Sequence, residues 1–324
     1  MRAVLIVNPN ATSTTAAGRD LLAHALESRA DVEVAHTEHR GHAIEIANQA
    51  RRSGTDVVVV HGGDGTVNEV VNGLLGAPHE PRPDPATLPA VAVVPGGSAN
   101  VFARALGISS DPLAATNQLI DAFSAHQGGK AWRRIGLMDC TERWSVFTAG
   151  LGVDGDVVAA VEAQRAKGRT VTAGRYIRIA VHQMLSQSRR EPQITVHLPG
   201  RDPIAGMHFA FVSNASPWTY ANDRPVWTNP GTTFDSGLGV FAVSSMSITR
   251  NLLLTRRMLS AKANVTAPHL LREDDLGWVR ITAKLPLACQ IDGDYVGPRD
   301  AMTFTSVPDI LPIVVPVGGQ AQEN

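Results

Sequence analysis

The feature that most constrains this chain is a run of four valines that leads into a glycine-rich turn. Val57–Val60 is a continuous apolar run of the kind that forms a strand buried on both faces. It is followed by His61, by Gly-Gly-Asp-Gly-Thr at residues 62–66 and by apolar residues at helical spacing over Val67–Leu75. A glycine turn between a strand and a helix start gathers backbone N–H groups and the positive helix end at one point, which favours binding of a phosphate.

A second glycine loop stands in the same relation to the next predicted strand. Ala90–Val94 leads into Pro-Gly-Gly-Ser at residues 95–98, before a predicted helix over Ala99–Leu106. Strands are also expected at Arg2–Val7 and Asp31–His36, with amphipathic segments between them. The alternation over about the first 125 residues predicts a parallel sheet with helices on both faces. Both loops would then share one sheet edge, where ligands of open α/β sheets bind.

The pattern changes beyond Trp132, where short alternating runs predict antiparallel strands and a mainly β domain. Helical segments near 171–186 and 248–262 interrupt these runs. We therefore expect an α/β domain over 1–129 and a β-sandwich domain over 130–305, divided at Gly128-Gly129. The strand-like end, 306–319, is expected to return to the first domain.

Composition excludes several classes of protein. The net charge of −1 is unlike that of a globally basic nucleic-acid binder, and no apolar run approaches the roughly 18 residues of a membrane span. Two isolated cysteines, Cys140 and Cys289, indicate a reducing compartment rather than a disulfide framework. A Gly-x-Gly-x-x-Gly motif spans Gly150–Gly155, but residues 163–190 hold no acid, which disfavours a dinucleotide site.

The charge is segregated along the chain. Residues 163–190 carry seven Arg or Lys and residues 236–272 carry five, and neither stretch contains an acid. Each includes an amphipathic helical segment. Such a segment either rests on an anionic membrane surface or packs on the sheet with its basic face in water, and the sequence leaves both open. Nucleic acid is disfavoured, because neither stretch interleaves aromatic with basic residues.

Motifs spread along most of the chain resemble the soluble diacylglycerol kinase-like lipid kinases, which include bacterial diacylglycerol kinases and the sphingosine kinases. The motifs that carry the resemblance are Asn8-Pro9, Thr37 with Gly41-His42-Ala43, the glycine turn through Val70, Pro95–Gly107, Gly150–Asp154, Asp235–Leu238 and Ile291–Asp294. The resemblance implies an N-terminal ATP-binding α/β domain and a C-terminal β-sandwich that takes the lipid. It also implies ATP with Mg²⁺, a cytoplasmic protein peripheral at the inner membrane surface, and no nucleic-acid partner; a homodimer is left open.

The resemblance also assigns roles to individual residues. Asp294 stands at the position of the carboxylate that accepts the proton of the lipid hydroxyl, and Asp64 would organise Mg²⁺ and the phosphates. Asp154 and Asn100 would position substrate. The nucleotide would lie against Asn8, Pro9, Asn10, Ala11, Thr12, Thr37, Gly62, Gly63, Asp64, Gly65, Thr66, Val67, Asn68, Glu69, Gly96, Gly97 and Ser98. A structural metal would lie at Thr233, Asp235, Ser236 and Leu238.

The chain departs from the family pattern at four positions. Ser13 stands near the place of a frequent lysine, Val101 replaces an aspartate, and Ser236 replaces the acid of the structural metal site. Asp294 is one methylene shorter than the more frequent glutamate. The sequence Asp292-Gly293 is also a strong hairpin-turn signal, which is compatible with a catalytic acid at the next residue.

Three functions follow from these observations. We expect a kinase that transfers the γ-phosphate of ATP to a lipid alcohol, with diacylglycerol as the preferred acceptor. An NAD kinase-like enzyme would share the Gly-Gly-Asp-Gly turn, but Asn68-Glu69 and the second glycine loop favour the lipid branch. A nucleotide- or lipid-binding protein without turnover is the third, and Val101 and Ser236 are its best support.

Overall fold

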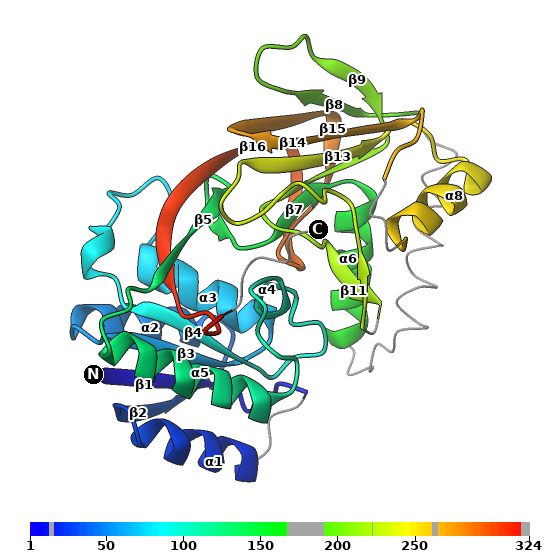
Figure 1. Ribbon diagram of the computed structural model, residues 1–324. Helices are drawn as coiled ribbons and strands as arrows, with labels where there is room; N and C mark the ends of the chain where they lie inside the picture. Colours follow the sequence, from blue (N-terminus) through cyan, green and yellow to red (C-terminus); the bar gives the residue numbers. More distant parts are fainter. Residues whose placement is uncertain (13–15, 167–190, 222, 261–264, 319–324) are drawn as a thin grey trace. The chain divides into compact units, whose positions relative to one another are not determined.

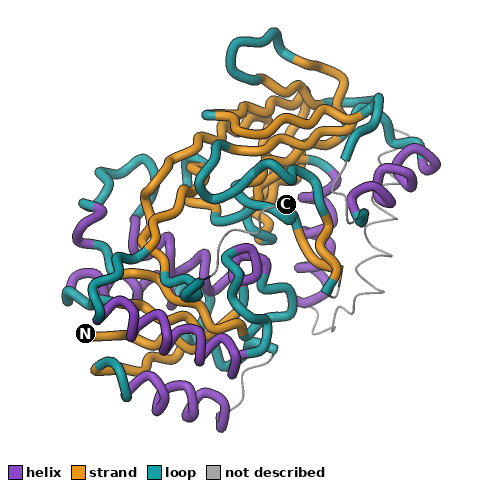
Figure 2. The backbone as a smooth tube through the Cα atoms, viewed as in Figure 1, coloured by secondary structure: helices purple, strands orange, loops and turns teal. Residues whose placement is uncertain are grey.

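The valine-rich segment forms strand β3 (Val57–Gly62) within a parallel sheet in the computed structural model (Figure 1). The strand order is β2-β1-β3-β4, followed by the end of β16, and each neighbouring pair is parallel. Every residue of β3 and of β4 (Ala90–Pro95) is buried. Helices cover both faces, since α2 packs on α3 and α1 on α5 (Figure 2). This confirms the predicted α/β fold of the N-terminal part.

The structure describes residues 1–12, 16–166, 191–221, 223–260 and 265–318. They form two units: Met1–Leu137 with Glu142–Val146 and Val307–Asn324, and Met138–Thr141 with Phe147–Ser306. The expected division at Gly128-Gly129 falls inside the first unit, at the end of α5. The first unit contains β1 (Arg2–Val7), α1 (Ala16–Glu27), β2 (Asp31–His36), α2 (His42–Arg52), β3, α3 (Asp64–Leu75), η1 (Pro85–Thr87), β4, α4 (Val101–Ala105), α5 (Pro112–Gln127), most of β5 (Arg133–Asp139) and β6 (Trp144–Ser145).

The second unit is mostly antiparallel β structure, as the alternating runs predict. Strands follow the order β14-β13-β10-β7-β15-β16, and β8 joins the first half of β15 and pairs with β9. Its elements are β7 (Thr148–Leu151), α6 (Val153–Ala166), β8 (Ile194–His197), β9 (Ile204–Met207), β10 (Phe209–Ser213), β11 (Thr219–Ala221), β12 (Arg224–Val226), β13 (Leu238–Val243), α8 (Ile248–Met258), β14 (Leu270–Leu276), β15 (Trp278–Ile291) and the first part of β16 (Asp294–Ile313).

Strand β10 shows how the alternating pattern builds this unit. Ala210 and Val212 face the main core, which also receives side chains from β7, β8, β13 and β15. Phe211, on the opposite face, packs with Phe241 and with Leu254 of α8. The period-two alternation therefore produces two apolar layers, one on each side of the same strands.

Several elements differ from the sequence expectation. Helix α5 was not predicted, although Asp111 accepts a hydrogen bond from the Ala114 N–H at 2.8 Å and Pro112 opens the helix, which are ordinary start signals. The runs expected near 301–305 and 306–319 belong to one long strand, β16, whose end pairs with β4. The helix expected near 171–186 and the departure at Ser13 lie outside the described residues. Within the described ranges, every helix is too short or too polar to cross a lipid bilayer.

Candidate nucleotide and substrate site

The carboxyl ends of three adjacent strands bring the predicted nucleotide loops together. Val7 at the end of β1 is in register with His61 of β3, which is in register with Val94 of β4. The chain turns toward β2 after β1 and toward β4 after β3, so the strand order reverses between β1 and β3. In open α/β sheets the crevice at such a reversal is where ligands bind. The loops that begin at Asn8, Gly62 and Gly96 all leave the sheet at this edge.

The two glycine loops touch through their backbones. The Gly96 N–H donates to the Gly62 carbonyl at 2.8 Å. A Cβ added at Gly97 would lie 2.7 Å from the Gly63 Cα, and a Cβ added at Gly63 would lie 3.3 Å from the Gly97 Cα. A Cβ at Gly62 would meet Thr66 Oγ1 at 2.8 Å. Close approach therefore requires glycine at Gly97, because a side chain there would force the two loops apart.

The loop after β1 is tied to the glycine turn through Asn8. The Asn8 N–H donates to the His61 carbonyl at 3.0 Å, and Asn8 Nδ2 donates to Thr66 Oγ1 at 3.1 Å. Asn8 Oδ1 accepts from the Asn10 N–H at 3.0 Å. Pro9, Asn10 and Thr12 are exposed at this edge, and Ala11 is half-buried. Asn8 thus fixes the first loop while its neighbours remain open to a ligand.

Asp64 joins the first glycine loop to helix α4. One carboxylate oxygen accepts from the Val101 N–H and the other from the Phe102 N–H, both at 3.0 Å. Asn100, the residue before α4, has φ +49° and makes no side-chain cap to the helix. The carboxylate therefore caps α4, a contact that the sequence analysis did not anticipate, and it holds the two loops in a fixed relation.

Other predicted nucleotide and substrate residues hold the site together from inside. Asn100 Oδ1 accepts from the Gly97 N–H at 3.0 Å, and its Nδ2 donates to the Gly97 carbonyl at 2.7 Å, which closes the second loop. Asn68 is fully buried, and its Nδ2 donates to the Trp144 carbonyl at 2.9 Å. Glu69 accepts from the Gly41 N–H at 2.9 Å. These side chains support the loops, whereas Ser98 is exposed and Gly65 has open space around it.

Two buried residues complete the base of this edge. The Thr37 N–H donates to the Val7 carbonyl at 2.9 Å, which places Thr37 at the end of β2 beside the first loop. Burial lowers the pKa of His61 below its usual 6.5, and the contact with the Val94 carbonyl at 3.1 Å opposes that shift only in part. Because a carbonyl only accepts, the neutral ring donates from Nδ1. Sequence reasoning missed this histidine, which links β3 to β4 directly beneath the glycine loops.

The predicted catalytic acid Asp294 belongs to the second unit, at the first residue of β16. Asp292 and Gly293 both have positive φ, +49° and +80°, and they form the two-residue hairpin turn that their sequence predicts. Asp292 is buried, and its Oδ1 accepts from the N–H groups of Phe147 and Thr148, each at 3.0 Å. The turn is thereby fixed to β7, and Asp294 is half-buried beside it.

The Gly150–Gly155 motif serves packing within the second unit. The Gly152 N–H donates to the Ala288 carbonyl at 2.9 Å, and Gly152 has φ +91°. A Cβ at Gly155 would collide with the Ala288 backbone, so α6 begins against β15 with no room for a side chain. Asp154 lies in the first turn of this helix, which places its backbone near the strand that leads into the Asp292 turn.

The residues expected to bind a structural metal do not fit a divalent cation. The Ser236 N–H and Oγ both donate to the Thr233 carbonyl, each at 3.1 Å, and Ser236 Oγ accepts from the Thr233 N–H at 2.8 Å. The loop at 233–236 is therefore closed by the Ser236 hydroxyl. Among the four residues expected to bind the metal, only Asp235 has a charged oxygen. Leu238 is fully buried at the start of β13. In the part of the chain that the structure describes, no three His, Cys, Asp or Glu side chains gather as a metal site.

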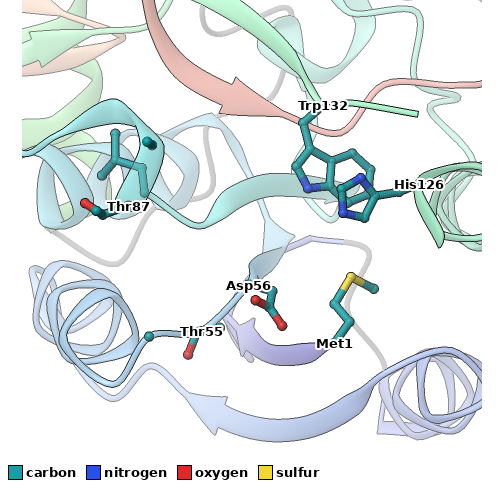
Figure 3. Close-up of a pocket in the computed structure, with 9 residues that line it drawn as sticks. Met1, Thr55, Asp56, Thr87, His126 and Trp132 are labelled. Atoms are coloured by element: carbon teal, nitrogen blue, oxygen red, sulfur yellow. The ribbon is translucent and has the colours of Figure 1, made fainter. Parts of the chain in front are cut away.

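The first unit also has a cavity of about 390 Å³, at the opposite edge of the parallel sheet. Met1, Asp56 and Leu88 line it, and they precede β1, β3 and β4 respectively. Figure 3 shows the stacked rings of His126 and Trp132 at one side, with centroids 3.8 Å apart, and the Asp56 carboxylate across from them. This cavity is distinct from the glycine loops, which leave the other ends of the same strands.

Known proteins resemble the chain in sequence and in fold. Residues 2–126 match the family model of the diacylglycerol kinase catalytic domain. Diacylglycerol kinases of Staphylococcus haemolyticus and Staphylococcus aureus strain JH9 are 38% and 39% identical over 85 and 88 residues. The matched segments cover 26% and 27% of this chain and 23% and 25% of those relatives, so the match spans about a quarter of their length.

Two solved structures from Bacillus anthracis share the fold over nearly the whole chain. One is described as a diacylglycerol kinase, with a TM-score of 0.67, 18% identity and coverage of 97% of this chain and 96% of that one. The other is described as a candidate diacylglycerol kinase, with a TM-score of 0.71, 19% identity and coverage of 97% of both chains. Residues 2–126 of this chain therefore resemble the diacylglycerol kinase catalytic domain, and the chain shares its fold with these two structures.

Proposed function

We propose that this protein transfers the γ-phosphate of ATP to the hydroxyl of a lipid alcohol, with diacylglycerol as the preferred acceptor and phosphatidic acid as the product. The observation that carries the proposal is the backbone contact of the glycine loops at Gly63 and Gly97, within the segment that matches the catalytic domain. A cradle without side chains, at the point where the strand order reverses, suits closely approaching phosphates.

The first unit would bind the nucleotide. The phosphates would lie against the glycine turn at 62–66 and the second loop at 96–98, with the N-terminus of α3 offsetting their charge. The exposed residues of the 8–12 loop would contact the remainder of the nucleotide. Mg²⁺ would enter with ATP, bound mainly by phosphate oxygens, and would offset the charge that develops during transfer.

The second unit would supply the proton acceptor. In this proposal the lipid hydroxyl oxygen forms a bond to the γ-phosphorus as the bond to the β-phosphate oxygen breaks, and ADP leaves with that electron pair. Asp294 accepts the proton of the hydroxyl, as a carboxylate does in general base catalysis. Asp64 acts through position, because its carboxylate holds α4 and with it the second phosphate loop.

The test is transfer of labelled phosphate from γ-labelled ATP with Mg²⁺ to diacylglycerol, sphingosine and ceramide in mixed micelles, with NAD as a further acceptor. Asp294→Asn is expected to lower the rate by about 10²-fold or more, the usual contribution of a general base. Asp300→Asn is the matched control, since Asp300 is an exposed acid on the same strand. Labelled phosphatidic acid that is lost in Asp294→Asn and kept in Asp300→Asn is the expected result.

Other outcomes would select other functions. Labelled NADP with no labelled lipid would indicate a small-molecule kinase that shares the glycine turn. ATP binding without transfer to any acceptor would indicate a binding protein on a kinase fold. Full activity in Asp294→Asn would remove that residue from the mechanism and leave the remaining proposal in place.

A further inference from the structure

Helix α8 (Ile248–Met258) of the second unit has an outer face that stays exposed among the residues the structure describes. Ile248, Leu252 and Leu253 are 65%, 69% and 61% exposed. Figure 1 shows α8 at the periphery of its unit, in yellow. Large aliphatic side chains that are neighbours and this exposed are unusual on the surface of a soluble protein. Such a patch indicates a site that contacts another apolar surface.

The inner face of α8 is firmly attached, which leaves the outer face free of a role in folding. Leu254 is buried in the layer that contains Phe211 and Phe241. Asn251 Nδ2 donates to the Ser245 carbonyl at 2.9 Å, and Asn251 Oδ1 lies 3.3 Å from His269 Nε2. The helix therefore has a fixed orientation, and the exposed leucines are held outward.

The charged residues in the chain segment that contains these leucines are all basic. Arg250, Arg256 and Arg257 lie on the same helix and are exposed, and the sequence has no acid between residues 236 and 272. A helix that exposes both arginines and aliphatic side chains suits a surface that is apolar in depth and anionic at its boundary. A protein partner would need acidic side chains placed opposite the arginines. A bilayer with anionic headgroups offers both the negative charge and the apolar interior at once.

We propose that α8 docks this protein on the surface of an anionic lipid bilayer, with Ile248, Leu252 and Leu253 in the acyl boundary and the arginines at the headgroups. This proposal rests on the proposed lipid-kinase function, because the lipid alcohol that accepts the phosphate resides in a bilayer. The helix has 11 residues and lies in the interface, where its charged side chains stay in contact with headgroups and water.

The test is cosedimentation of the full chain with vesicles of phosphatidylcholine alone or of phosphatidylcholine and phosphatidylglycerol in equal parts, with no nucleotide present. The wild-type chain is expected to bind the anionic vesicles, and raising the salt from about 0.15 M to about 1 M should weaken binding. The double variant Leu252→Ser with Leu253→Ser should lower the partition coefficient at least tenfold. Each of Arg250→Ala and Arg256→Ala should lower it about fivefold, the equivalent of about 1 kcal/mol.

Matched controls separate docking from general surface changes. Leu113→Ser removes a leucine with 57% exposure from α5, and Arg52→Ala removes an exposed arginine from α2. Both controls should bind vesicles as the wild type does. Because the changed α8 side chains are exposed, their thermal unfolding midpoints should match that of the wild type, which excludes misfolding as the cause of lost binding.

Two results would overturn the docking proposal. Equal vesicle binding by the wild type and by the double leucine variant would exclude α8. A concentration-dependent dimer in sedimentation velocity that the double leucine variant abolishes, without vesicle binding by the wild type, would assign this face to a second copy of the chain. Neither result depends on turnover. A chain that binds vesicles through α8 yet phosphorylates no lipid would therefore refute the proposed function alone.

Discussion

The contact between the glycine loops makes a sharp prediction about Gly97→Ala. The added Cβ would lie 2.7 Å from the Gly63 Cα and 3.1 Å from Asn100 Oδ1. Ordinary Cβ contacts begin at 3.4 Å, so the loops must separate by about 0.7 Å, and the obstacle at Gly63 is backbone that cannot rotate away.

The displacement fixes the size of the effect. Overpacking of this kind costs about 1–3 kcal/mol of unfolding free energy. A 1 Å misplacement of reacting groups costs about 100-fold in rate, so a shift of this size should lower kcat/KM for ATP by about 10- to 100-fold. The second loop would carry the change, since the Asn100 side chain closes that loop on Gly97.

The assay pairs urea unfolding at pH 7 with initial rates at varied ATP. Gly65→Ala is the control for stability, because that glycine lies in α3 with nothing within 4 Å of an added Cβ. It should leave the unfolding free energy unchanged or raise it by up to about 1 kcal/mol. If Gly97→Ala unfolds at the wild-type urea concentration and keeps the wild-type kcat/KM, the loops are not in rigid contact and the reasoning fails.

Three further predictions follow from buried and half-buried polar groups. Asp64→Asn should lower the unfolding free energy measured in urea by about 1–3 kcal/mol and should also lower kinase activity. The reason is that the asparagine amide has one accepting oxygen, whereas the carboxylate accepts from two N–H groups of α4. Unchanged stability would argue against the cap. Asp292→Ala should lower the unfolding free energy by about 2–4 kcal/mol in the same assay. Asp292→Asn should lower it clearly less, because asparagine keeps an accepting oxygen and tolerates positive φ. Equal losses in the two variants would contradict this prediction. Burial lowers the pKa values of His61, His208 and His269 below 6.5, with a further contribution from a nearby arginine at His269. The unfolded chain then binds more protons, so the unfolding free energy should fall as the pH drops below about 6.5, and a rise on acidification would refute the assignment.

The loops were predictable from the sequence because strand and turn signals are local. Val57–Val60 and Ala90–Val94 are short apolar runs, and each is followed by paired glycines. Once both strands are placed in one parallel sheet, the register of its neighbours brings their carboxyl ends to the same edge. The contact between Gly63 and Gly97 follows from that topology.

The roles of several acids and amides were not predictable, because they depend on distant partners. The helix predicted over Ala99–Leu106 is present as α4, but its cap by Asp64 depends on Asn100 taking positive φ, which the sequence pattern does not reveal. Asp292 is fixed by the backbone of β7, more than 140 residues earlier in the chain. Asn68 follows the helix pattern of a buried position, yet its partner, the Trp144 carbonyl, is visible only in the folded unit.

The same limit applies to the loop at residues 233–236. The sequence locates Ser236 where a relative would place an acid, but it does not say what the hydroxyl does. In the structure the Ser236 hydroxyl bonds to both backbone groups of Thr233: it accepts from the Thr233 N–H and donates to the Thr233 carbonyl. The serine therefore closes the loop through hydrogen bonds of its own hydroxyl.

The measurement that tests the central claim most directly is mass analysis of the products formed from ATP and dioleoylglycerol in mixed micelles. The account predicts phosphatidic acid in amounts that match the ADP released, at a rate that Asp294→Asn lowers by about 10²-fold. Bound ATP with no phosphorylated lipid would contradict it, whereas phosphatidic acid formed equally fast by the Asp294→Asn variant would remove only Asp294 from the mechanism.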